Sequence, residues 1–171
     1  MDAEQRATEA SARRLRERIR SMFGRSLQIR HVDAGSCYGC ELELQTLTNP
    51  YYDMNRLNLF FTTSPRHADM LLVTGPVTRN MELALKNTYD AMPEPKIVAA
   101  CGTCACNGGL FSYGDYAAAT GLDVFLPVDV YIPGSPPNPL ALIQGLLAVL
   151  DRMEQKARHQ RIVIGPETSD G

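Results

Sequence analysis

Short apolar runs alternate along this chain with longer segments of helical pattern. The short runs predict buried strands, over residues 27–32, 57–62, 68–74, 96–100 and 124–132. The segments between them predict helices, over residues 41–47, 80–91 and 140–154. Strands that alternate with helices in this way are typical of an α/β domain with a largely parallel sheet.

The N-terminal segment has its own pattern. Its apolar stripe, spaced as one face of a helix over residues 3–23, comprises Leu15, Ile19, Met22 and Phe23. The part of this helix before Leu15 has no apolar face, so we expect it to be disordered or held by a partner. The predicted organisation is a basic N-terminal helical extension, an α/β domain and a loose polar C-terminal tail, over residues 1–26, 27–155 and 156–171.

The net charge of −2 conceals an uneven distribution of charge. Residues 1–30 contain eight arginines and four acidic residues, whereas the rest of the chain contains nine basic and fifteen acidic residues. The basic segment can face an acidic protein surface, anionic lipid or nucleic acid, or it can be an ordinary solvated helix face.

Length and composition indicate a soluble globular protein. The chain has 171 residues, of which 44% are hydrophobic and 21% charged, and this suits one domain with a real core. No apolar run approaches the roughly 18 residues of a membrane span, and the first twenty residues lack the apolar stretch of a signal peptide. We therefore expect a cytoplasmic, reducing compartment, where cysteines usually serve metal or redox chemistry.

The five cysteines form two clusters, which are Cys37 with Cys40, and Cys101 with Cys104 and Cys106. The odd count argues against a purely disulfide framework, and two thiolates three positions apart can reach one metal centre from a single turn. Both clusters, like residues 133–139, follow a predicted strand, and the carboxyl ends of parallel strands meet at one edge of the sheet. The sequence therefore predicts a metal or iron–sulfur site at that edge.

Two kinds of centre suit these thiols. A four-cysteine zinc site would pair Cys37 and Cys40 with Cys101 and Cys104. Small residues around Cys104 leave room for a bulkier iron–sulfur cluster, which thiolates also favour. Taken singly, Cys101 and Cys106 can also be inert, buried cysteines that pack as small hydrophobic residues.

Glu41 directly follows Cys40 and is the candidate for acid–base chemistry. Its carboxylate would assist proton transfer beside a redox centre, or it would simply stabilise the N-terminus of the following helix. The sequence has no glycine-rich phosphate loop of either standard spacing and no convincing Ser-His-Asp pattern, so nucleotide binding and hydrolytic catalysis have no support.

Six motifs occur in a fixed order: Ser-Cys-Tyr-Gly-Cys-Glu-Leu-Glu at 36–43, Ser-Pro-Arg-His-Ala-Asp at 64–69, Leu-Val-Thr-Gly-Pro-Val-Thr at 72–78, Cys104 with Gly108-Gly109, Pro-Val-Asp-Val-Tyr-Ile-Pro-Gly at 127–134, and Pro136-Pro137. With these motifs the chain resembles, over about residues 27–150, the small iron–sulfur subunit of energy-converting (group 4) [NiFe] hydrogenases and formate hydrogenlyases. That family is homologous to the 20 kDa (B) subunit of complex I. The resemblance implies a flavodoxin-like, three-layer α/β domain that holds one [4Fe-4S] cluster.

The resemblance also implies the ligands of the cluster, which are Cys37, Cys40 and Cys104. The fourth ligand of the family is a cysteine, and this chain has Ser135 at that position. Either the Ser135 oxygen ligates iron, or Cys101 or Cys106 supplies the fourth sulfur, or the cluster is labile, three-iron or missing. The two-residue spacer between the first cysteines is the hydrogenase-like form, since complex I relatives carry adjacent cysteines there.

The implied function is that of an electron-transfer subunit in a membrane-associated oxidoreductase. The implied partners are a large subunit similar to that of [NiFe] hydrogenase or to the complex I 49 kDa subunit, a ferredoxin-like iron–sulfur subunit, and membrane subunits, with no nucleic acid. We expect a peripheral position on the cytoplasmic face of the inner membrane. Ser135 motivates the alternative of a structural or assembly subunit whose cluster is degenerate or absent.

Overall fold

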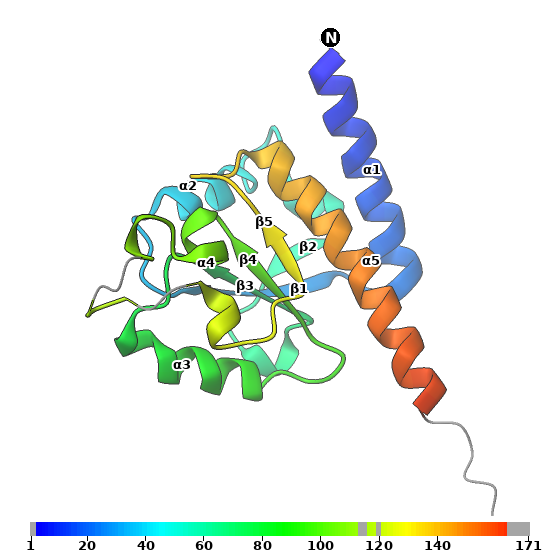
Figure 1. Cartoon of the computed structure of the whole chain (residues 1–171). Coiled ribbons are helices and arrows are strands. Elements are labelled where there is room, and N and C mark those ends of the chain that lie inside the picture. Colours follow the sequence, from blue (N-terminus) through cyan, green and yellow to red (C-terminus); the bar gives the residue numbers. More distant parts are fainter. Residues whose placement is uncertain (1–2, 113–115, 119–120, 164–171) are drawn as a thin grey trace, which may run out of the picture.

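Five parallel strands form the centre of the protein, and helices cover both faces of the sheet (Figure 1). The computed structural model describes residues 3–112, 116–118 and 121–163. The strands are β1 (Leu27–Asp33), β2 (Leu59–Phe61), β3 (Met70–Thr74), β4 (Ile97–Cys101) and β5 (Val130–Ile132). The helices are α1 (Ala3–Phe23), α2 (Gly39–Thr46), α3 (Arg79–Asp90), α4 (Thr103–Asn107) and α5 (Pro139–Val163). Short 3-10 turns occur between them, at Met54–Leu57 (η1), Pro65–His67 (η2), Gly109–Phe111 (η3) and Leu122–Val124 (η4).

The strand order is β2-β1-β3-β4-β5, and every neighbouring pair is parallel. This is the order of flavodoxin-like folds, in which the chain reverses direction across the sheet between β1 and β3. In register, Asp33 lies opposite Thr74, Thr74 opposite Cys101, and Cys101 opposite Ile132. The carboxyl ends of four strands therefore lie level at one edge. The predicted α/β class with its parallel sheet is confirmed.

Alternate residues of the central strands enter two separate hydrophobic cores. Met70 and Leu72 of β3 pack on the face covered by α1, α2 and α5, whereas Leu71 and Val73 pack on the opposite face with residues of α3 and α4. All five residues of β3 and of β4 are buried, which explains why both strands appear in the sequence as continuous apolar runs. The result is a three-layer arrangement (Figure 1).

Helix α1 packs against α5 at one side of the molecule (Figure 1). Leu15 and Ile19 of its predicted stripe are fully buried in the core, and the side chain of Phe23 lies outside the described residues. On one flank of the helix, Arg18 forms ion pairs with two carboxylates of α5. The helix begins at Ala3, so the half before Leu15 continues the same helix rather than being disordered.

Several predicted boundaries are wrong. Only Val130–Ile132 pairs as a strand at the end of segment 124–132, since Val124 ends the 3-10 turn η4 and Pro127 has no N–H to donate to a ladder. The last helix continues to Val163, well beyond residue 154, so the first part of the expected tail is helical. The rest of the tail, residues 164–171, lies outside the described residues. None of the described helices is long and apolar enough to cross a membrane.

Candidate functional site

The loops that follow β1, β4 and β5 meet at the carboxyl edge of the sheet, as the sequence predicted. The β4 and β5 loops are joined by hydrogen bonds, from Gly102 N to Ile132 O at 2.9 Å and from Thr103 N to Gly134 O at 2.7 Å. The β1 loop adjoins them, since a Cβ at Gly39 would lie 4.0 Å from Pro136. All predicted site residues are carried by these three loops, or by the strand and helix ends beside them.

The β1 loop presents the first two cysteines on either side of a tight backbone turn. Asp33 shapes its start by accepting hydrogen bonds from two backbone N–H groups, at 2.8 and 2.7 Å. Tyr38 adopts φ 70°, which is uncommon for a residue with a side chain, and its hydroxyl accepts a 2.6 Å hydrogen bond from Gln45 Nε2. This turn leads directly into α2, so Cys37 is exposed before the helix and Cys40 is half-buried in its first turn.

Two glycines keep space open beside the thiols. A Cβ at Gly102 would lie 2.6 Å from the sulfur of Cys40, and a Cβ at Gly109 would lie 3.0 Å from the sulfur of Cys104. Both glycines have positive φ angles, of 88° and 53°, which residues with side chains rarely adopt. Both positions therefore favour glycine for steric and for conformational reasons, and the two sulfurs pack closely against them. We call this pair of contacts the glycine cradle.

Cys101 is fully buried at the end of β4, and its side chain hydrogen-bonds with that of Cys40. This hydrogen bond raises the pKa of the Cys101 thiol, and burial raises it further. The same hydrogen bond lowers the pKa of Cys40. Within this pair, Cys101 is thus favoured as the protonated donor and Cys40 as the thiolate.

Cys104, in α4, lies near the first cysteine pair. Burial raises the pKa of its thiol, and the charges of Cys37 and Cys40 raise it further, which is the mark of neighbouring thiols. The Cys104 thiol therefore lies within electrostatic range of the two thiols with which the resemblance implied a shared role.

Cys106 and Ser135 differ from these three. The Cys106 thiol faces backbone carbonyls, 3.7 Å from Ala100 O and 3.9 Å from Ile132 O, and burial raises its pKa. Ser135 is exposed on the β5 loop, next to the proline that approaches Gly39. Of the three candidates for a fourth ligand, Cys101 and Cys106 already have hydrogen-bond partners inside the protein.

Glu41 is buried and only 7% exposed, although it follows Cys40 directly. Ser36 Oγ donates to one of its carboxylate oxygens at 2.5 Å, and Thr74 Oγ1 donates to the other. The Nε2 atom of His31 lies 2.9 Å from Thr74 Oγ1 and 3.6 Å from Glu41 Oε1. Burial lowers the pKa of His31, so the neutral ring is favoured.

No partner for His31 could be predicted from the sequence, because the group forms only when β1 and β3 pair. His31 and Thr74 are 43 positions apart, and only the parallel register of the two strands brings them together. The position of His31 along β1 was the signal in the sequence that it lies near the site, since it comes two residues before the strand's carboxyl end.

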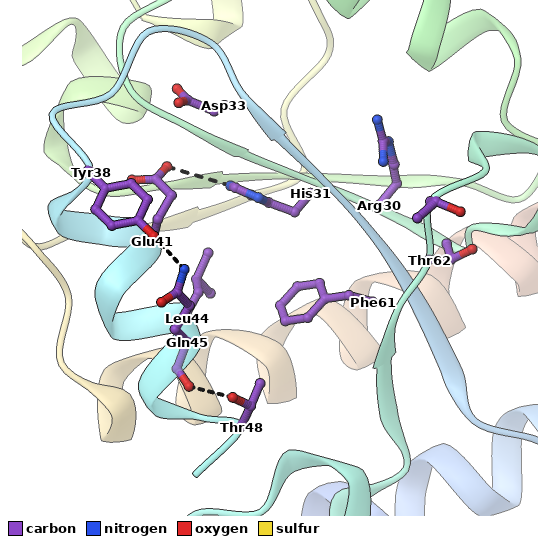
Figure 2. A pocket seen from close by; sticks show the side chains of 11 residues that line it. Arg30, His31, Asp33, Tyr38, Glu41, Leu44, Gln45, Thr48, Phe61 and Thr62 are labelled. Atoms are coloured by element: carbon purple, nitrogen blue, oxygen red, sulfur yellow. Dashed lines mark hydrogen bonds and ion pairs between the residues drawn. The ribbon is translucent and has the colours of Figure 1, made fainter.

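A pocket of about 490 Å³ adjoins this polar group, between α2 and the strands β1 and β2 (Figure 2). Glu41 and His31 point toward one another on its wall, while Leu44 and Phe61 supply apolar surface (Figure 2). Buried acid–base groups thus lie between the cysteine loop and a cavity large enough for a small molecule or an inserted side chain.

The residues present fit a soft-metal centre. Soft thiolate ligands suit zinc or iron–sulfur centres, and a Cβ at Gly102 or Gly109 would crowd the sulfur of Cys40 or Cys104. Within the described part of the chain, no three His, Cys, Asp or Glu side chains lie close enough to hold a single metal ion.

Comparisons with known proteins show which family the chain belongs to. Residues 37–149 match the model of the family described as "NADH ubiquinone oxidoreductase, 20 Kd subunit". The chain is 42% identical over 144 residues to the "Probable membrane-bound hydrogenase subunit mbhJ" of Pyrococcus furiosus, with 82% of this chain and 86% of that protein covered. It also matches a chain of the solved "membrane-bound sulfane sulfur reductase (MBS), an archaeal respiratory membrane complex", with a TM-score of 0.66, 31% identity, and coverage of 84% of this chain and 87% of that one. The resemblance found in the sequence is confirmed, and the chain belongs to the family of the 20 kDa subunit of NADH ubiquinone oxidoreductase.

Proposed function

We propose that this chain is an electron-transfer subunit of a membrane-associated, hydrogenase-like or complex I-like oxidoreductase, and that it carries one [4Fe-4S] cluster. Membership of the family makes it a subunit of an oxidoreductase complex. When bound, such a cluster accepts and donates single electrons, while the protein sets its position, burial and hydrogen bonding.

The glycine cradle is the observation that carries the proposal. Cys37, Cys40 and Cys104 are the proposed ligands, because Gly102 approaches the Cys40 sulfur, Gly109 approaches the Cys104 sulfur, and the first two thiols act electrostatically on the third. The hydrogen bond from Cys101 lowers the pKa of Cys40 and so prepares a thiolate there. Cys101 would then act as a donor to a ligating sulfur, a contact of the kind that tunes cluster potentials.

Ser135 is the proposed fourth ligand. Its exposed side chain extends from the loop that adjoins Gly39, whereas the Cys106 thiol faces two carbonyl oxygens and Cys101 is engaged with Cys40. An alkoxylate is harder and more basic than a thiolate, so it would lower the reduction potential relative to a four-cysteine site.

Exposed apolar side chains beside the cradle support a docking face for the large subunit. Tyr38 is 50% exposed, Leu42 of α2 53% and Leu110 of η3 84%. An apolar surface of this kind at a redox site is suited to burial against another protein. Glu41, held by Ser36 and Thr74, would move a proton at its carboxylate between that interface and the pocket beside His31.

The test is anaerobic purification followed by iron, sulfide and zinc analysis and electron paramagnetic resonance (EPR) spectroscopy. We expect four irons per chain and a reducible signal, both lost in the Cys104→Ser variant and retained in the matched Cys106→Ser variant. A colourless protein with fewer than three irons would favour the structural or assembly role instead, and zinc alone would favour the four-cysteine zinc site.

Separate variants test whether Ser135 is the fourth ligand. Ser135→Ala should damage the cluster, and Ser135→Cys should raise its reduction potential. An unchanged EPR signal and potential in both variants would exclude Ser135 and direct attention to Cys101 or Cys106.

A further inference from the structure

A group of arginines lies on the flank of α1 that faces away from α5. Two adjoining hollows, of about 250 and 280 Å³, open between α1 and the segment that includes η1, and Arg16 lines both of them. Arg13 and Arg56 also line the first hollow, and Arg20 and Arg25 also line the second. We call this the arginine surface.

The arginine surface has few internal counter-charges. Arg25 forms a bidentate pair with Asp69, at 2.9 and 2.6 Å. In the part of the chain that the structure describes, no hydrogen bond or ion pair involves the guanidinium groups of Arg13, Arg16, Arg20 or Arg56. Glu9 lines the first hollow, and Glu17 lies in the same helix, so the local charge remains positive.

The two flanks of α1 differ in whether their arginines are paired with carboxylates. On the α5 side, Arg18 finds Asp151 and Glu154 within the same chain. On the η1 side, Arg13, Arg16 and Arg20 recur at i, i+3 and i+7, so they share one face, and among the described residues none of them forms an ion pair with a carboxylate. Several unpaired like charges repel one another, and an external anion relieves this repulsion.

We propose that the arginine surface binds an acidic segment of a neighbouring subunit in the oxidoreductase complex. Guanidinium groups match carboxylates in a bidentate geometry, which this chain already uses at Arg25 and Asp69. The hollows accept protruding side chains, whereas a lipid surface offers none. The apolar residues of α1 are also unavailable to a bilayer, because Leu15 and Ile19 are fully buried in the core.

The proposal rests on the chain's being a subunit of such a complex, but it does not depend on a cluster. A zero-length carbodiimide reagent, which couples an amine to a carboxylate in direct contact, tests it in the purified native complex. The chain has only three lysines, Lys86, Lys96 and Lys156, so a lysine introduced by Arg16→Lys would stand out by mass spectrometry. Arg14→Lys is the matched control, because Arg14 is exposed on α1 but lines neither hollow.

We expect the Arg16→Lys variant to cross-link to an aspartate or glutamate of another subunit, and the Arg14→Lys variant not to do so. Absence of a cross-link from both variants, or equal cross-linking from both, would overturn the proposal and leave an ordinary solvated helix face. A lipid surface is tested with vesicles of phosphatidylcholine and phosphatidylglycerol. The proposal would be overturned in favour of lipid if no subunit cross-link formed, the full chain bound these vesicles, and the Arg13→Glu/Arg16→Glu/Arg20→Glu variant did not. Iron and sulfide content, measured on the same samples, reports separately on the proposed electron-transfer function.

Discussion

Replacing Gly102 by alanine should disrupt the thiol cradle while leaving the fold in place. Gly102 adopts φ 88° and ψ 154°, a region open essentially to glycine alone, and an alanine there costs about 1–3 kcal/mol. The new Cβ would also lie 2.6 Å from Cys40 Sγ, where ordinary contact begins near 3.4 Å, so the two atoms must separate by about 0.8 Å. Cys40 is fixed in the first turn of α2 and hydrogen-bonded to Cys101, so it cannot move alone.

Gly24→Ala is the matched control for this experiment. Gly24 has φ 61°, so alanine there costs about 1–2 kcal/mol of similar backbone strain, but no atom lies within 4 Å of its added Cβ. Urea unfolding should therefore show a loss of stability in both variants. Iron and sulfide content and the EPR signal should decline only in Gly102→Ala. Parental iron content in Gly102→Ala, or an equal loss of iron in both variants, would refute the assignment of this glycine to the cradle.

Three further predictions concern the parts of the fold that support the site. Ile19→Ala removes a fully buried side chain between α1 and the core, so it should lower the free energy of unfolding by about 2–5 kcal/mol in urea titrations. Arg14→Ala, on the exposed face of the same helix, should change this free energy by less than about 0.5 kcal/mol. Lys156→Met leaves the buried carboxylate of Asp129 without its 2.7 Å partner and should lower the thermal midpoint measured by circular dichroism; an unchanged midpoint would show that this ion pair does not hold α5. The pKa of His31 is lowered in the fold, so the unfolded chain binds more protons and stability should fall as the pH decreases below about 6.5. His31→Gln should reduce this pH dependence, and identical unfolding curves of variant and parent across that pH range would contradict the role given to burial.

The predictions that succeeded from sequence were those in which local pattern and tertiary structure agree. Strands β3 and β4 are buried on both faces, so their apolar runs needed no knowledge of partners. The helix predicted over 80–91 corresponds to Arg79–Asp90, because its apolar face and the prolines after it act locally. The meeting of the cysteine loops followed from topology, since parallel strands carry their following loops to one edge.

The predictions that failed depended on contacts between distant residues. The last helix extends beyond residue 154, and Lys156 there reaches Asp129 and the backbone of Lys96, both far away in sequence. Asp129, directly before the short β5, donates its backbone N–H to Val98 O. The hydrophobic pattern alone does not reveal this pairing. The His31–Thr74 contact likewise exists only through strand register.

The carboxyl edge of the sheet holds two groups with opposite steric demands. The Cys40 thiol needs a neighbour without a Cβ, which Gly102 supplies, whereas the Glu41 carboxylate needs close donors, which Ser36 and Thr74 supply. Both demands are met because Thr74 of β3 lies in register with Cys101 of β4. The alignment of these two strands therefore sets how Thr74 meets Glu41 and how Cys101 meets Cys40, both of which belong to α2. A one-residue slip would move every side chain of the strand to the other face and dismantle both groups together. The continuous burial of β3 and β4 therefore does more than stabilise the core, since it fixes the alignment on which thiols and carboxylate jointly depend.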